Sequence, residues 1–189
     1  MQPQILQTMH ASIADVIADT AQNSIEAGAK NVTVRLVEDG EYVSVSIADN
    51  GKGMDESVLR RVFDPFFTEA GKHDRRKVGL GLPILKQLCE ATGGSLELKS
   101  EKGVGTVLDY RFEAKHLDLP PMGDLAGMAL ALFNYPGDFE LEFSHRRLSE
   151  EYSVLRSELS EAVGGLDSVE SLSMAREFLE CQEEALKTP

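Results

Sequence analysis

The residues best suited to chemistry stand at the end of an alternating stretch, in the run Asp49-Asn50-Gly51-Lys52-Gly53-Met54. Residues 42–48 before it alternate between apolar and small polar side chains, which predicts a strand with Asp49 on its apolar side. Burying a carboxylate there costs free energy unless hydrogen-bond donors satisfy it. The two glycines have no side chain, so the backbone can bend or another molecule can approach it closely. This arrangement suits a flat heterocycle with an amino group, such as adenine. The alternative is an ordinary turn, for which Asp-Asn-Gly is also favourable chemistry.

A second pair of polar residues lies on a predicted helix that runs from Ile13 and ends before Gly28. Asp19 and Asn23 are four residues apart, so they lie on the same side of that helix. An Asn amide oxygen is a suitable ligand for Mg²⁺. A carboxylate one turn earlier could orient water or take a proton. The same pair could equally line a solvated helix face.

Residues 68–77 have no apolar periodicity and carry the densest basic run of the chain. Such a loop is suited to holding phosphate oxygens, or it is only a solvated loop. Aromatic side chains precede it in residues 63–67, where they could wall a base-binding slot or simply pack. Glycines follow it in residues 79–82 and open a helix to about residue 92, which leaves backbone N–H groups able to face an anion.

The order of elements predicts an α+β fold, a two-layer sandwich with a mixed or antiparallel sheet and helices on one face. Two hairpins supply the strands, over residues 31–48 and 95–113. Leu119-Pro120-Pro121 marks a boundary, which divides the chain into residues 1–116 and an α-rich C-terminal extension over residues 122–189. The elements expected in the extension are a helix over 124–133, a strand over 139–145, and helices over about 149–163 and 168–187.

Composition narrows the function further. The chain has 189 residues, 42% of them hydrophobic, and a net charge of -13, which disfavours broad contact with nucleic acid. Cys89 and Cys181 are not spaced as metal ligands are, and we expect both to be reduced thiols. No signal sequence opens the chain and no apolar run is long enough to span a bilayer, so we expect a cytoplasmic protein without membrane insertion.

Taken together, residues 15–113 resemble the GHKL ATPases, the superfamily of gyrase, the large heat-shock chaperone, histidine kinases and mismatch-repair proteins. The region from Phe63 to Thr106 is most similar to histidine kinases, and residues 23–29 are more similar to mismatch-repair ATPases. Five boxes occur in the superfamily's order: Asp19-Thr20-Ala21-Gln22-Asn23, Asp49-Asn50-Gly51-Lys52-Gly53, Phe63-Asp64-Pro65-Phe66-Phe67-Thr68, Gly79-Leu80-Gly81-Leu82 and Gly103-Val104-Gly105-Thr106.

The resemblance implies a Bergerat-type fold that binds ATP and Mg²⁺. It implies that Asp49 accepts a hydrogen bond from the adenine amino group with Thr106 nearby, and that Asn23 holds the metal. Asp19 is the candidate catalytic residue. One or more of Lys72, Arg75, Arg76 and Lys77 would reach the phosphates. The full expected binding set is Asn23, Asp49, Gly51, Gly53, Met54, Phe63, Phe66, Lys77, Gly79, Leu80, Gly81, Leu82 and Thr106.

The chain departs from the superfamily's pattern in ways that bear on function. ATP-hydrolysing members carry Glu where this chain has Asp19, and histidine kinases usually carry glycine at the place of Lys77. We expect no dimerising hairpin with a phosphoacceptor ahead of the first helix, and none of the histidines, at positions 10, 73, 116 and 145, has the surroundings of such an acceptor.

We therefore expect a histidine-kinase-like module, an ATPase or protein kinase, that acts in signalling or regulation on a separate protein partner. The alternative is a catalytically weak switch that binds ATP and a partner. The segment from Gly123 to His145 is weakly similar to extensions on small ATP-binding proteins found alongside iron-only hydrogenase systems.

Overall fold

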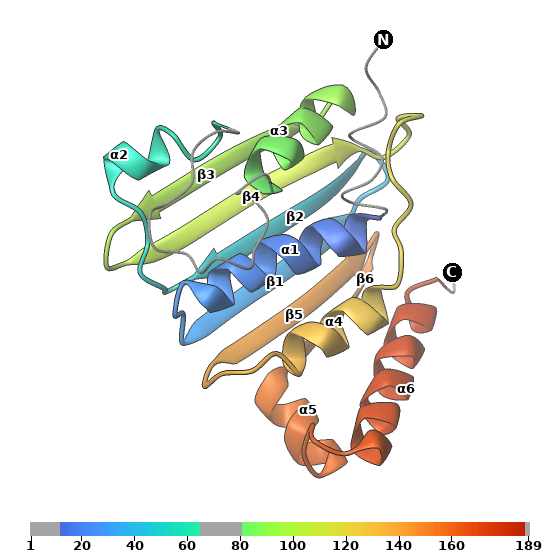
Figure 1. Ribbon diagram of the computed structural model, residues 1–189. Coiled ribbons are helices and arrows are strands. Elements are labelled where there is room, and N and C mark those ends of the chain that lie inside the picture. Colours follow the sequence, from blue (N-terminus) through green and yellow to red (C-terminus); the bar gives the residue numbers. More distant parts are fainter. Residues whose placement is uncertain (1–11, 65–80, 188–189) are drawn as a thin grey trace.

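The computed structural model describes residues 12–64 and 81–187, which form a six-stranded sheet with helices on one face (Figure 1). The strand order is β3-β4-β2-β1-β5-β6. Neighbouring strands are antiparallel except β1 and β5, which are parallel. The sheet is therefore mixed, as expected. Its strands are β1 (Asn31–Glu38), β2 (Tyr42–Asp49), β3 (Ser95–Glu101), β4 (Gly105–Glu113), β5 (Glu140–Arg147) and β6 (Glu150–Leu155).

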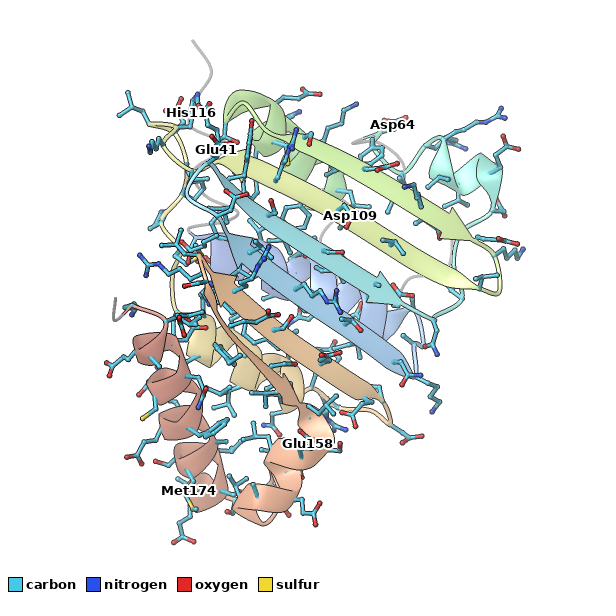
Figure 2. All side chains as sticks on the ribbon, turned by 180° about the vertical axis from the view of Figure 1, so that it is seen from behind. Glu41, Asp64, Asp109, His116, Glu158 and Met174 are labelled. Carbon is cyan, nitrogen blue, oxygen red and sulfur yellow. The ribbon has the colours of Figure 1, made fainter. Side chains whose placement is uncertain are left out.

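Helices α1 (Ile13–Glu26), α3 (Gly81–Ala91) and α4 (Leu125–Phe133) lie side by side over the same face of the sheet (Figure 1). Helix α1 begins where the Ser12 hydroxyl accepts a hydrogen bond from the Asp15 N–H, and its apolar side is buried at helical spacing. The short α2 (Glu56–Leu59) follows β2 and is capped by Asp55. The opposite face of the sheet carries polar side chains such as Asp109 (Figure 2).

The predicted hairpins are confirmed, and both have the inward residues that alternation indicated. On β2 the buried side chains are Val43, Val45 and Ile47, and on β4 they include Tyr110 and Phe112. The turn between β1 and β2 is held by the Asp39 carboxylate, which accepts hydrogen bonds from two backbone N–H groups. The core thus lies between the sheet and α1, α3 and α4.

The C-terminal segment differs from expectation. The helix predicted over residues 149–163 is wrong for its first half, where Glu150–Leu155 forms β6 and only Arg156–Val163 forms a helix, α5. Tyr152 and Val154 are both buried and pair with β5, so buried side chains recur there at every second residue, as in a strand. A short segment fits either period, and pairing with β5 decides between them. The last helix, α6 (Val169–Ala185), agrees with the predicted one.

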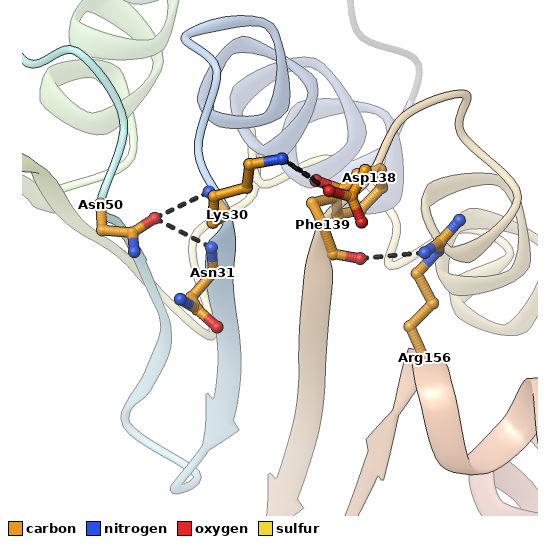
Figure 3. Close-up of polar contacts among 6 residues, drawn as sticks. All are labelled: Lys30, Asn31, Asn50, Asp138, Phe139 and Arg156. Carbon is orange, nitrogen blue, oxygen red and sulfur yellow. Dashed lines mark hydrogen bonds and ion pairs between the residues drawn. The ribbon is translucent and has the colours of Figure 1, made fainter.

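Polar contacts join the C-terminal segment to the rest of the chain beside the start of β1 (Figure 3). The Lys30 ammonium pairs with Asp138 at 2.7 Å, and the Asn50 side chain accepts hydrogen bonds from the N–H groups of Lys30 and Asn31. Within the C-terminal segment, Arg156 donates to the carbonyl of Phe139.

Strand β5 continues the sheet next to β1, so both proposed parts of the chain share one sheet. The division of the chain between residues 116 and 122 stays a prediction.

Within the described ranges 12–64 and 81–187, no helix combines the length and the apolar character needed to cross a lipid bilayer.

Candidate functional site

Asp49 lies at the last position of β2, opposite Thr106 of β4 and Val32 of β1. Its carboxylate is held from two directions. The Ser24 hydroxyl of α1 donates to Asp49 Oδ2 at 2.7 Å, and the Gly51 N–H donates to Oδ1 at 2.8 Å. The donors that a carboxylate needs at the edge of an apolar layer are thus present.

The same carboxylate keeps the capacity to bind a ligand. An ionised carboxylate has about four acceptor positions, and Ser24 and Gly51 each use one. Asp49 is only half-buried, so one side of the group remains open to an incoming molecule. A fixed acceptor with spare capacity at a strand end can receive a hydrogen bond from an exocyclic amino group.

The loop after Asp49 depends on its glycines. Gly51 is buried against the end of α1, where a Cβ would lie 3.0 Å from both the Cβ and the carbonyl oxygen of Ala27. At Gly53 φ is +58° and a Cβ would lie 1.9 Å from the carbonyl oxygen of Glu101. A side chain at Gly53 would collide with main chain, and one at Gly51 would be tightly crowded, so the glycines let the loop run this close to the β3–β4 hairpin and to α1.

Thr106 belongs to a small polar group on the β3–β4 hairpin. Thr106 Oγ1 lies 2.9 Å from the Ser100 hydroxyl, which also accepts a hydrogen bond from the Met54 N–H at 2.9 Å. Gly105 precedes Thr106 because a Cβ there would lie 2.0 Å from the Asp49 carbonyl oxygen. The hairpin therefore fixes Thr106 and Met54 together, next to the end of β2.

Asp19 and Asn23 lie on α1, one turn apart, with Asp19 half-buried and Asn23 exposed. A Cβ at Gly81, the first residue of α3, would lie 2.5 Å from Asp19 Oδ2. The structure thus brings the first and fourth boxes into contact, although about 60 residues separate them. An exposed Asn amide near a carboxylate is a donor set that fits Mg²⁺.

The aromatic box is described only in part. Phe63 is half-buried, and the ammonium of Lys86 on α3 lies 5.5 Å from the centre of its ring. Leu82 packs against the core from the same helix. The remaining predicted binding residues, Phe66, Lys77, Gly79 and Leu80, lie outside the described residues, as do the basic residues at 72, 75 and 76.

Ser24 and Ser100 are residues that the sequence reasoning missed. Ser24 sat on the inward stripe of the predicted helix and appeared to be a small core residue. No pattern within the helix distinguished it from a core residue, since neighbouring helix residues point in different directions. Ser100 faces Thr106 across the β3–β4 hairpin, and that register was available from the predicted turn.

A separate polar cluster lies at the other end of β1, around His145 of β5. The ring is 2% exposed, with Nδ1 3.0 Å from Glu183 Oε1 and Nε2 3.1 Å from Glu38 Oε1. Tyr152 donates to the same Glu183 oxygen at 2.5 Å. Both ring nitrogens are thus engaged and buried. In the part of the chain that the structure describes, no cluster of three or more His, Cys, Asp or Glu is arranged to hold a metal ion.

A glycine-cleared loop and a strand-end carboxylate beneath helices on one face of a mixed sheet define an ATP-binding α/β sandwich of the GHKL type. The chain belongs to the family of histidine kinase-, DNA gyrase B- and HSP90-like ATPases, whose pattern matches residues 10–119. This membership confirms the resemblance read from the boxes, and the family's domain binds ATP.

Individual relatives are sensor proteins. The chain is 33% identical over 111 residues to the sensor protein KdpD of Clostridium acetobutylicum, covering 56% of this chain and 12% of that protein. It is 31% identical over 102 residues to a putative sensor histidine kinase, NtrY-like, of Rickettsia conorii, covering 52% and 16%. The matched part is thus a small share of each relative.

A solved structure shares the fold over most of the chain. The N-terminal domain of a DNA repair protein superposes with a TM-score of 0.58 at 13% identity, covering 88% of this chain and 60% of that one. At this identity the likeness concerns the fold alone.

Proposed function

We propose that this chain is an ATP- and Mg²⁺-binding module, related to the histidine-kinase ATPase domains, that acts in signalling on a separate protein partner. The observation that carries the proposal is the Asp49 carboxylate, held by Ser24 and Gly51 beside Thr106 with acceptor capacity to spare. The adenine amino group would donate to this carboxylate. The loop glycines let the chain after Asp49 lie close to α1 and to the β3–β4 hairpin, which holds the loop beside the carboxylate.

The phosphate end of the site would lie along α1. Asn23 would hold Mg²⁺ with its amide oxygen, and the metal, when bound, would neutralise phosphate charge. Asp19 of α1 is the candidate for orienting water or taking a proton, and its closeness to Gly81, the first residue of α3, supports this role. The partner is proposed to be a protein because a net charge of -13 opposes both nucleic acid and anionic membrane surfaces.

The first test is calorimetric titration of ATP with Mg²⁺ into the wild type, Asp49→Asn and a matched control, Asp109→Asn. Asp109 is on the other face of the sheet (Figure 2). We expect Asp49→Asn to weaken ATP binding by roughly 10- to 100-fold, since one amide oxygen replaces a charged acceptor pair. Asp109→Asn should leave binding unchanged. Equal affinities for all three proteins would remove the basis of the proposal.

A second candidate function is an ATP-responsive switch that binds a partner without catalysis. The observation that favours it is Asp19, whose carboxylate is one methylene shorter than the Glu of ATP-hydrolysing members. Phosphate release and transfer of labelled phosphate to candidate partners, measured on the same sample, separate the two. Turnover that Asp19→Asn abolishes supports the enzyme. Tight binding with no turnover and no transfer supports the switch.

A further inference from the structure

Helix α6 has one face packed against the rest of the protein and another that is exposed. The packed face includes Ala175 and Leu179, both fully buried, and Glu183, which accepts a hydrogen bond from Tyr152 and is hydrogen-bonded to His145. Through these residues α6 lies against α4, which separates it from α1 and the nucleotide site (Figure 1).

The outer side of α6 carries an apolar row that stays exposed in the described part of the chain. Met174 is 55% exposed and Phe178 is 42% exposed, and Cys181 and Ala185 continue the row in exposed positions. These residues follow one another at intervals of four, three and four, which is the spacing of a coiled-coil seam. Met174 is seen at the edge of the molecule, on α6 (Figure 2).

An acidic row runs beside this seam. Glu170, Glu177 and Glu184 are spaced by seven residues, so they form a line along one side of the helix, and all are exposed. In a coiled coil, positions that flank the seam select the partner by charge. The basic residue of α6, Arg176, lies on the side of the helix away from the seam, where it pairs with Asp124, the N-cap of α4, and with Glu180.

We propose that the outer face of α6 docks an amphipathic helix of a partner protein, with apolar side chains over Met174 and Phe178 and Lys or Arg facing the glutamate row. The inference deepens the proposed function, on whose partner role it rests, by naming the docking surface. A second copy of this chain is a poor occupant. It carries the same net charge of -13, and an antiparallel copy would set one glutamate row against another.

The probe is a synthetic helical peptide of about three heptads with Leu in its seam and Lys on both flanks, and its twin has Glu in place of Lys. Binding is measured by fluorescence anisotropy. We expect the Lys peptide to bind the wild type and the Glu peptide not to bind. Replacing Met174 and Phe178 together by Ser should weaken binding by at least roughly tenfold, because the buried apolar contact is lost.

Charge reversal tests the partner's chemistry. The triple variant Glu170→Lys, Glu177→Lys, Glu184→Lys should invert the preference from the Lys to the Glu peptide. The matched control is Glu150→Lys, Glu151→Lys, Glu161→Lys, at exposed positions, which changes the net charge equally and should keep the original preference. Circular dichroism and thermal unfolding verify that each variant is folded.

Several results would overturn the inference. These are an absence of Lys-peptide binding, equal binding of both peptides, or inversion by the control variant. Sedimentation showing a dimer that the double Ser variant dissociates would instead make a second copy the occupant. Asp49→Asn should bind the Lys peptide as the wild type does, so loss of the nucleotide site and loss of the docking surface are distinguished.

Discussion

The Ser24 hydroxyl donates a hydrogen bond of 2.7 Å to Asp49, which ties the last turns of α1 to the end of β2. Ser24 is buried, so this bond is shielded from competing water. The contact fixes the orientation of the carboxylate before any ligand arrives. Affinity for the nucleotide should therefore depend on Ser24, although the side chain itself need not touch the ligand.

Ser24→Ala is expected to weaken ATP binding by roughly 3- to 10-fold in calorimetry, because Asp49 loses one of two donors that hold it. The matched control is Ser44→Ala on the other face of the sheet, which should bind ATP as the wild type does. If Ser24→Ala also binds as the wild type does, the Gly51 N–H alone is enough to orient the carboxylate.

Gly53→Ala should destabilise the protein more than Gly103→Ala. Both glycines have positive φ, +58° and +80°, so each substitution carries a backbone cost of about 1 kcal/mol. Only at Gly53 does the new Cβ meet main chain, 1.9 Å from the Glu101 carbonyl, whereas Gly103 faces open space. We expect a difference of at least about 1 kcal/mol in the free energy of unfolding in urea. Equal losses would show that the loop can move away from the hairpin.

The contact between Asp19 and Gly81 predicts coupling between these residues. In the wild type, Gly81→Ala should destabilise the protein, because its Cβ would lie 2.5 Å from the Asp19 carboxylate. In an Asp19→Ala background the same change should be neutral or stabilising by up to about 1 kcal/mol, since alanine favours the helix. A double-mutant cycle in urea measures the coupling. Additive effects would mean that Asp19 swings aside freely.

The His145 cluster predicts a defined dependence of stability on pH. Burial alone lowers the pKa of the imidazole, but hydrogen bonds with Glu183 and Glu38 outweigh it and raise the pKa above 6.5. Hydrogen bonding to His145 outweighs partial burial and lowers the pKa of Glu38 from 4.5, and the charge of nearby Arg147 lowers it further. Tyr152 also faces the ring, with centroids 6.3 Å apart.

The direction of the effect follows from these shifts. The imidazolium contributes stability that is complete below pH 6.5 and lost as pH rises through its raised pKa. The Glu38 carboxylate contributes stability above pH 4.5 that is lost as pH falls through its lowered pKa. Between about pH 6 and 9 the wild type should lose unfolding free energy that His145→Gln does not lose, because only the wild type carries the imidazolium. Parallel urea curves for both proteins would contradict the prediction.

Local chemistry determined much of this protein from its sequence. Alternation in residues 31–48 and 95–113 specified two hairpins, because a strand with one buried face must repeat every two residues. The stripe from Ile13 to Ile25 specified the first helix for the same kind of reason. The glycines around Lys52 and the strand-end carboxylate also indicated the candidate nucleotide site, since only glycine tolerates the backbone conformation and close main-chain contact found at Gly53.

Only the tertiary structure decided which distant segments meet. The sequence of Glu150–Leu155 is compatible with helix or strand, and the free edge of β5 made it a strand. The pairing of Ser24 with Asp49, and of His145 with Glu38 and Glu183, joins side chains 25 to 107 residues apart. Such contacts depend on how layers pack rather than on local period, so no pattern within one segment could have revealed them.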